Sequence, residues 1–346
     1  MSTHSTSPST HSTSLSTYGF DGHWRELAAS VTSPGEPGRV TVVDRGSCGV
    51  GMETGFRHVR TSRHNVCTGD WVVVDNETVT AVLPRRTAIV RATAGGTSAS
   101  QTLASNVDTV VITVAADVGL DLGRVERYLA LAWDSGATPL LVVTKCDKSS
   151  AASFLVDGLL SAAPGVSLAT VSSVTGDGID ELLGLLVGTT AVIGPSGSGK
   201  STLANTLVGE GALDTGDVRA ADSKGRHTTV RRELLRMPVT GQCIIDTPGL
   251  RSVGLVASEA GLHQTFSDID ELAGLCRFND CSHRSEPGCA VRDAVDPRRI
   301  ANYHRLEREN HWATTRRDAR ENQKRLAEAK AISKAQRRMY KARNEW

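Results

Sequence analysis

The sequence has no run of apolar residues close to the roughly 18 that a membrane-spanning helix needs. Its N-terminus also lacks a basic segment followed by an apolar one, which is the pattern of a secretory signal. Only 14 of the 346 residues are aromatic, so a surface that binds nucleic acid mainly by stacking on bases is not expected. The first two of these absences predict a protein that does not bind membranes.

Cysteines are few and unevenly placed. The chain has 7, an odd number, and 3 of them lie between positions 276 and 289. A framework of paired disulfides does not fit this pattern, whereas a metal site in a reducing compartment does. We therefore expect a cytoplasmic protein.

Charge is balanced overall but divided along the chain. The formal net charge is +1, yet residues 301–346 hold 13 Lys and Arg against 6 Asp and Glu, a net of +7, which leaves −6 for the remainder. This segment is rich in Ala, Arg, Glu and Lys and has no Pro or Gly, so we predict a basic helical tail. It favours an anionic partner such as RNA. The alternative is a solvated helix with internal ion pairs, for example Arg317 with Glu321.

Two different patterns fill the first hundred residues. Residues 1–17 hold 12 Ser and Thr and no aromatic, and we predict a disordered Ser/Thr-rich tail over 1–36. Short strand-like segments separated by Gly, Asn and Asp follow. They predict an OB-like β-barrel (the oligonucleotide-binding type) over 37–97. The alternative is a small β-domain without a ligand.

Residues 98–265 show apolar runs that alternate with segments of helical spacing. The runs at 107–115, 139–143 and 190–193 are typical of strands buried on both faces. This alternation predicts a parallel α/β sheet with crossover helices.

The strongest motif follows the last of these runs. It matches GxxxxGK[ST], comes directly after a strand-like segment and opens a helix, which is the context that a phosphate-binding loop requires. Backbone N–H groups would surround the phosphates, Lys200 would reach the β- and γ-phosphates, and Ser201 would bind Mg²⁺. The predicted nucleotide-binding residues of this loop are Gly194, Pro195, Ser196, Gly197, Ser198, Gly199, Lys200, Ser201 and Thr202.

Two earlier segments predict the base that the nucleotide carries. Asp147 follows an apolar run and can accept hydrogen bonds from the N1–H and the 2-amino group of guanine, which adenine does not offer. Ser172 and Ser173 begin a loop that could present a backbone N–H to guanine O6. We therefore predict GTP as the nucleotide, and an ATP-using enzyme such as a small-molecule kinase is the alternative that Asp147 argues against. The segment around Asp147 also contains Thr144, Lys145 and Cys146.

An acidic motif follows another apolar strand, 46 residues after the loop lysine. Asp246 at the end of this strand could hold Mg²⁺, and the backbone N–H of Gly249 could sense a γ-phosphate. Alone the motif could be a plain turn, but its place behind a phosphate loop favours a nucleotide switch.

Residues 266–300 predict a small zinc-binding domain. Cys276, Cys281, His283 and Cys289 supply three thiols and one imidazole, which is a complete tetrahedral set for one structural Zn²⁺. A segment of this size could not bury a core without such a staple. The alternative is a group of free buried cysteines.

The order of the motifs is unusual. The base-binding segments (144–147 and 172–176) precede the phosphate loop (194–201) and the acidic motif (246–249), whereas most guanine-nucleotide switches begin with the phosphate loop. A circular permutation keeps the same sheet with this order. Together with the barrel and the Cys/His segment, these motifs resemble the circularly permuted GTPases that act on the small ribosomal subunit during its assembly. The resemblance covers about residues 37–305.

This resemblance implies roles that spacing alone does not assign. Residues 225–229 resemble the first switch of the family, in which a threonine coordinates Mg²⁺, and this implies Thr229 with Thr228 beside it. Leu250 stands where many GTPases place a water-orienting Gln. The resemblance therefore implies His227 as the catalytic group, and the alternative is a surface histidine beside a phosphate site.

The sequence thus predicts a multidomain protein: an OB-like β-barrel, a circularly permuted P-loop α/β GTPase domain, and a C-terminal zinc-binding and helical domain. It would hydrolyse GTP with Mg²⁺, using Lys200 and His227. As the resemblance implies, it would bind ribosomal RNA of the small ribosomal subunit. We also expect a monomer. Thr144 stands where the guanine-binding motif usually begins with Asn, which puts base affinity in question. The alternative function is a nucleotide-regulated RNA-binding module with negligible hydrolysis.

Overall fold

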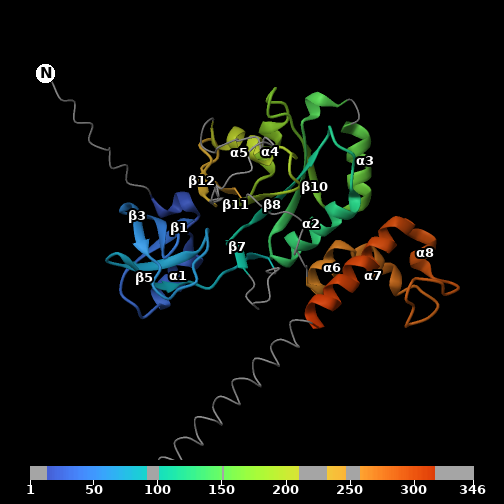
Figure 1. Ribbon diagram of the computed structural model, residues 1–346, viewed down its shortest axis with the longest axis horizontal. Coiled ribbons are helices and arrows are strands. Elements are labelled where there is room, and N and C mark those ends of the chain that lie inside the picture. Colours follow the sequence, from blue (N-terminus) through green and yellow to red (C-terminus); the bar gives the residue numbers. More distant parts are fainter. Residues whose placement is uncertain (1–13, 92–100, 150–151, 210–231, 247–257, 316–346) are drawn as a thin grey trace, which may run out of the picture.

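The computed structural model describes residues 14–91, 101–149, 152–209, 232–246 and 258–315. A small barrel lies at one end of the molecule, and a six-stranded sheet with helices on both faces lies in the middle (Figure 1). A group of short helices packs beside helix α2 of this middle part. No helix within the described ranges is long and apolar enough to span a bilayer.

The barrel closes in the strand order β1-β2-β3-β5-β4. Its interior is filled mainly by valines, among them the fully buried Val40, Val50 and Val72. The small closed barrel confirms the predicted architecture of this part. Its strands are β1 (Glu36–Val43), β2 (Ser47–Met52), β3 (Gly55–Arg60), β4 (Trp71–Asp75) and β5 (Thr78–Val82).

The segment before the barrel is ordered, which corrects the prediction of a disordered tail over 1–36. It forms a 3₁₀ turn, η1 (Leu15–Tyr18), and a helix, α1 (Gly22–Ser30). Trp24 is 2 % exposed and packs on Trp71 of β4, with ring centroids 5.7 Å apart. A few large apolar side chains therefore order a stretch whose composition is otherwise polar. The remainder of the predicted tail lies outside the described residues.

One predicted barrel strand belongs elsewhere. We predicted the barrel to extend to residue 97, but β6 (Ala88–Arg91) pairs with β7 (Gln101–Ser105) in a separate two-stranded sheet. Ile89 of β6 is 1 % exposed and lies in the apolar core of the central domain, together with Leu103 of β7. The strand leaves the barrel because the central domain buries its apolar side chain.

The central sheet has the order β10-β9-β8-β11-β13-β12, and all neighbours are parallel except β12 and β13. Helices α2 and α3 contribute to the core on one face, and α4 and α5 to the core on the other. This arrangement confirms the predicted parallel α/β sheet. The elements are β8 (Thr109–Ala115), α2 (Leu122–Asp134), β9 (Thr138–Thr144), η2 (Cys146–Lys148), α3 (Ala152–Ala162), β10 (Ser167–Thr170), α4 (Ile179–Leu185), β11 (Thr189–Ile193), α5 (Lys200–Val208), β12 (Leu234–Arg236) and β13 (Cys243–Asp246).

The barrel contacts the sheet at its β12 edge. Val42 of β1 makes an isolated antiparallel bridge with Glu233, directly before β12. The Thr68 hydroxyl, in the barrel, donates to the carbonyl oxygen of Arg232 at 3.2 Å. The barrel therefore contacts the strand that follows the predicted switch segment at 225–229.

The C-terminal helices have a core of their own, which includes the fully buried Phe266. Helix α6 also packs closely on α2, since a Cβ at Gly261 would lie 2.4 Å from the carbonyl oxygen of Ala130. The last helical segment runs across the border that we predicted at residue 300 between the zinc domain and the tail. The elements are α6 (Glu259–Thr265), α7 (Ser267–Ala273), α8 (Ala290–Ala294) and the helical residues 297–315.

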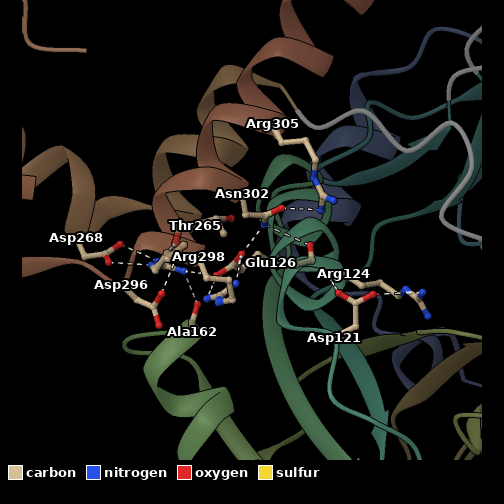
Figure 2. A network of polar contacts seen from close by, with 12 residues as sticks. Asp121, Arg124, Glu126, Ala162, Thr265, Asp268, Asp296, Arg298, Asn302 and Arg305 are labelled. Atoms are coloured by element: carbon tan, nitrogen blue, oxygen red, sulfur yellow. Dashed lines mark hydrogen bonds and ion pairs between the residues drawn. The ribbon is translucent and has the colours of Figure 1, made fainter. Parts of the chain in front are cut away.

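A buried carboxylate fastens these helices to α2 (Figure 2). Glu126 has a side chain with no exposed surface, and it accepts two hydrogen bonds from Arg298 at 2.9 and 3.1 Å. Arg299 and Asn302 donate to the same carboxylate, Arg299 at 3.0 Å. Arg299 is itself 3 % exposed and also pairs with Asp268 at 2.7 Å. Polar contacts therefore hold the C-terminal helices in place in addition to apolar packing.

Candidate functional site

The predicted phosphate loop connects β11 to α5 at the carboxyl edge of the sheet. Gly194, Gly197 and Gly199 have φ angles of 149°, 78° and 78°, a backbone region that glycine adopts without strain. Helix α5 begins at Lys200, whose Nζ donates to the carbonyl oxygen of Pro195 at 2.6 Å. The positive end of the α5 dipole therefore lies at the loop, which favours anions there.

The remaining loop residues differ in exposure. Ser196 and Gly197 are exposed at the tip of the loop, and Ser198 is buried beneath them. Ser201 is partly buried in the first turn of α5, and Thr202 is exposed. A cavity of about 110 Å³ opens between the loop and the start of α2.

The two predicted base-binding segments meet at the carboxyl ends of β9 and β10. Asp147, in η2, accepts a hydrogen bond from the Ser172 hydroxyl at 2.7 Å. The Ser172 oxygen in turn accepts from the backbone N–H groups of Val174 and Thr175 at 3.3 and 3.2 Å. The carboxylate and the serine loop are therefore held as one unit, with Ser173 partly buried next to Ser172.

Lys145 has a partner that the sequence analysis missed. Its Nζ lies 3.0 and 3.2 Å from the two carboxylate oxygens of Asp117, and its backbone is left-handed, with a φ of 58°. Asp117 follows β8, the strand beside β9, so its position at the end of a neighbouring apolar run was the available signal. Cys146 is half-buried, and burial raises the pKa of its thiol.

Thr144 links the two halves of the site. It is the last residue of β9 and is 3 % exposed. Its hydroxyl donates to the backbone carbonyl of Ser198 in the phosphate loop at 2.8 Å. The predicted base-binding segment and the predicted phosphate loop are therefore in direct contact.

The acidic motif is described only in part. Asp246 is the last residue of β13, and its backbone pairs with Val192 of β11, the strand that leads into the phosphate loop. The end of β13 therefore lies beside that loop. The other predicted switch and catalytic residues lie outside the described ranges, and their roles stay predictions: His227, Thr228, Thr229 and Gly249.

The four predicted zinc ligands lie together between α7 and α8. Ligand atoms of Cys276, Cys281, His283 and Cys289 all lie within 4.8 Å of one another. Nδ1 of His283 is 3.4 Å from Sγ of Cys289, and the Sγ atoms of Cys276 and Cys289 are 3.9 Å apart. Bonds of 2.3 Å in a tetrahedron would place sulfur atoms about 3.8 Å apart, so the side chains fit a zinc ion.

Two family models match the chain. The model described as RsgA GTPase matches residues 82–256, a range that contains the phosphate loop and both base-binding segments. The model of ABC transporters matches residues 187–342, a range that begins with β11 and the phosphate loop. Loops of this type hold nucleotide phosphates in many ATPases as well as GTPases, which accounts for the second match.

Several curated proteins are similar to this chain over most of its length. A "Small ribosomal subunit biogenesis GTPase RsgA" of Streptomyces coelicolor is 47 % identical over 337 residues, covering 91 % of this chain and 92 % of that protein. The protein of the same name in Streptomyces avermitilis is 48 % identical, covering 88 % and 87 %. That of Xanthomonas axonopodis is 43 % identical, covering 72 % and 70 %.

Two solved structures share the fold. The crystal structure of YjeQ from Thermotoga maritima has a TM-score of 0.58 at 23 % identity, covering 80 % of this chain and 98 % of that one. The crystal structure of YloQ, described as a circularly permuted GTPase, has a TM-score of 0.56 at 22 % identity, covering 80 % and 95 %. The predicted circularly permuted fold is confirmed.

Proposed function

Since this chain belongs to the RsgA GTPase family, we propose that it hydrolyses GTP to GDP and phosphate in the assembly of the small ribosomal subunit. The observation that carries the proposal is the contact between the segment predicted to bind guanine and the predicted phosphate loop. Asp147 is held by Ser172, and Thr144 of the same segment donates to Ser198 of the loop at 2.8 Å. The names of the two Streptomyces relatives, which describe a GTPase of small ribosomal subunit biogenesis, support the ribosomal role.

For the reaction, Lys200 would exchange its present acceptor, the Pro195 carbonyl, for a phosphate oxygen of GTP. The oxygen of a water molecule attacks the γ-phosphorus, and the bond from this phosphorus to the oxygen that bridges the β- and γ-phosphates breaks, so that GDP leaves with the bridging oxygen. One hydrogen of the water stays on the attacking oxygen in the released phosphate, and the other passes as a proton to a phosphate oxygen or to solvent. We propose Ser201, Thr229 and Asp246 as the residues that hold Mg²⁺, which supplies positive charge to the phosphate oxygens. The chain's own contribution is mostly positioning and charge neutralisation.

We propose His227 as the group that orients the attacking water, because the alkyl side chain of Leu250 cannot form a hydrogen bond. In a His227→Ala variant we expect turnover to fall by on the order of a hundredfold, with little change in GTP affinity. Single-turnover hydrolysis and nucleotide binding measure the two quantities separately. An unchanged rate in the presence of small subunits would contradict this role.

We infer one structural Zn²⁺ at Cys276, Cys281, His283 and Cys289. These four side chains would fill all the positions of a tetrahedral site, so no position would be left for a reacting water. The ion would hold together the loop between α7 and α8, a segment with few buried apolar residues.

We propose that ribosomal RNA of the small subunit is the direct partner, contacted by the barrel and the basic tail over 301–346. The outer side of the barrel carries exposed arginines and the 59 % exposed Phe56. Such a surface suits phosphates with one stacking side chain, as in other OB-type barrels. The exposed arginines are Arg45, Arg57, Arg60 and Arg63.

The cytoplasmic location, the monomeric state and the absence of a membrane partner stay predictions.

The test is phosphate release from GTP, with ATP as the control, by the purified protein with and without small ribosomal subunits. We expect a slow basal rate that is selective for GTP and strongly raised by the subunits. GTP binding without turnover in either condition would instead favour a nucleotide-regulated RNA-binding module.

A further inference from the structure

Ser198 of the predicted phosphate loop forms hydrogen bonds with residues of two strands of the sheet, β8 and β9. Its side chain is buried, at 1 % exposure, and its hydroxyl lies 2.6 Å from the hydroxyl of Thr113 and 2.8 Å from the carbonyl oxygen of Pro195. Thr113 is fully buried in β8, and its hydroxyl also lies 3.2 Å from the carbonyl oxygen of Ile193. Each hydroxyl carries one proton. If Ser198 donates to Thr113, then Thr113 donates to the carbonyl oxygen of Ile193 in β11; if Thr113 donates to Ser198, then Ser198 donates to the carbonyl oxygen of Pro195 in the loop.

The backbone of Ser198 is held from the other side by Thr144. The Thr144 hydroxyl donates to the Ser198 carbonyl oxygen at 2.8 Å, and a second carbonyl, that of Val114, lies at 3.4 Å. The single proton of Thr144 is therefore engaged with the loop and with β8. An amide side chain could donate two protons at this position, whereas a hydroxyl that serves the loop has none left for the base.

The glycines of the loop fit closely against these two threonines. A Cβ at Gly194 would lie 2.3 Å from the Thr113 hydroxyl, and a Cβ at Gly199 would lie 3.3 Å from the Thr144 hydroxyl. Both glycines have positive φ angles. The loop therefore packs against Thr113 and Thr144, the two residues that also form hydrogen bonds with it.

We propose that Thr113 and Thr144 are positioning residues that fix Ser198, and through it the phosphate loop, in the conformation that binds phosphates. In this assignment Thr144 serves the phosphate half of the site and leaves guanine recognition to Asp147. The inference rests on the proposed function, because it assumes that the loop binds GTP. A pre-formed loop raises affinity since the free protein spends less time in conformations that cannot bind.

The experiment compares Thr113→Val and Thr144→Val with a matched control, Thr109→Val. Thr109 lies in the same strand β8, is 4 % exposed, and donates to the carbonyl oxygen of Val187 at 2.9 Å, but at the opposite end of the sheet. Dissociation constants are measured for GTP, GDP, ITP, whose base lacks the 2-amino donor, and 7-deaza-GTP, whose base lacks the N7 acceptor. Thermal unfolding of each variant is recorded alongside.

We expect Thr113→Val and Thr144→Val to weaken GTP, GDP and ITP by the same factor, about three- to tenfold. The ratios of GTP affinity to ITP affinity and to 7-deaza-GTP affinity should stay at their wild-type values, and Thr109→Val should bind like the wild type. Thr144→Ser keeps the hydroxyl and should restore affinity, which separates loss of the hydrogen bond from a folding defect.

Two results would overturn the proposal. A change in the GTP-to-ITP or the GTP-to-7-deaza-GTP ratio in Thr144→Val would mean that this residue contacts the base. Unchanged affinities in both valine variants would mean that the loop needs no support from them. A wild-type protein that binds GTP without hydrolysing it would refute the proposed activity alone, because the binding comparison still tests the two threonines.

Discussion

The contact between α2 and the C-terminal helices allows a quantitative prediction, because it contains two glutamates, Glu126 and Glu309, that pair with arginines in different surroundings. Glu126 pairs with Arg298 and Arg299 and has no exposed side-chain surface. Glu309 pairs with Arg127 at 2.6 and 2.9 Å and has a side chain that is 41 % exposed. Both pairs connect the same helix to the same helical segment, so they form a natural control for one another.

We expect Glu126→Gln to lower the free energy of unfolding by about 3–5 kcal/mol. The neutral amide leaves Arg299, which is 3 % exposed, with Asp268 as its one remaining carboxylate among the contacts described above. It also turns an NH₂ group toward arginine donors, where a carboxylate oxygen had accepted. Glu309→Gln should cost less than about 1 kcal/mol, because solvent screens an exposed pair.

Urea denaturation followed by circular dichroism measures both variants, and hydrogen exchange of residues 259–273 and 297–315 locates the effect. We expect the midpoint of Glu126→Gln to fall by about 1 M or more. The exchange of these C-terminal helices should accelerate while the barrel is unaffected. Equal losses in the two variants, or a loss below about 1 kcal/mol for Glu126→Gln, would refute the reasoning from burial.

Three further predictions concern separate parts of the chain. Cys281→Ser should lower the zinc content from one ion per chain to almost none, whereas Cys67→Ser, at a buried thiol far from the cluster, should leave it unchanged; elemental analysis that finds equal zinc in both would contradict the site. Asp147→Asn should shift nucleotide preference from GTP toward xanthosine triphosphate in competitive binding, and no shift would undercut the assignment of the base site. The hydrogen bond to Asp270 raises the pKa of His263 above its usual 6.5, so the stability contributed by this pair is complete below pH 6.5 and is lost as the pH rises through the folded-state pKa. The pH dependence of unfolding between pH 6 and 8 should therefore be smaller in His263→Gln than in the wild type.

Sequence patterns predicted the central sheet well, because strands buried on both faces leave continuous apolar runs. The run at 107–115 became β8, and the phosphate loop follows β11 as the motif requires. The predictions failed where burial depends on a distant partner. Trp24 is ordered because Trp71 of the barrel lies against it, and Ile89 left the barrel because the central domain offers its side chain a core.

The same distinction applies to the site. Asp147 and Ser172 were predictable because each follows an apolar run, and parallel strands end at one edge of a sheet. Thr113 was not, because its contacts depend on β8 lying between β9 and β11. Nothing in the local sequence gives that strand order, and a threonine in an apolar strand looks like any other β-branched residue.

The permuted order also has a consequence for synthesis of the chain. In the sheet, strand β8 lies between β9 and β11. Strand β9 follows β8 closely in the sequence, whereas β11 begins only at residue 189 and is synthesised much later. Until β11 is synthesised, the edge of β8 that later pairs with it has no partner strand. Val110 and Ile112 of β8 are fully buried in the finished protein. Unpaired apolar edges attract other chains. We therefore expect the nascent chain to be most prone to aggregation between the emergence of β10 and that of β11, and truncations that end in this interval to be insoluble.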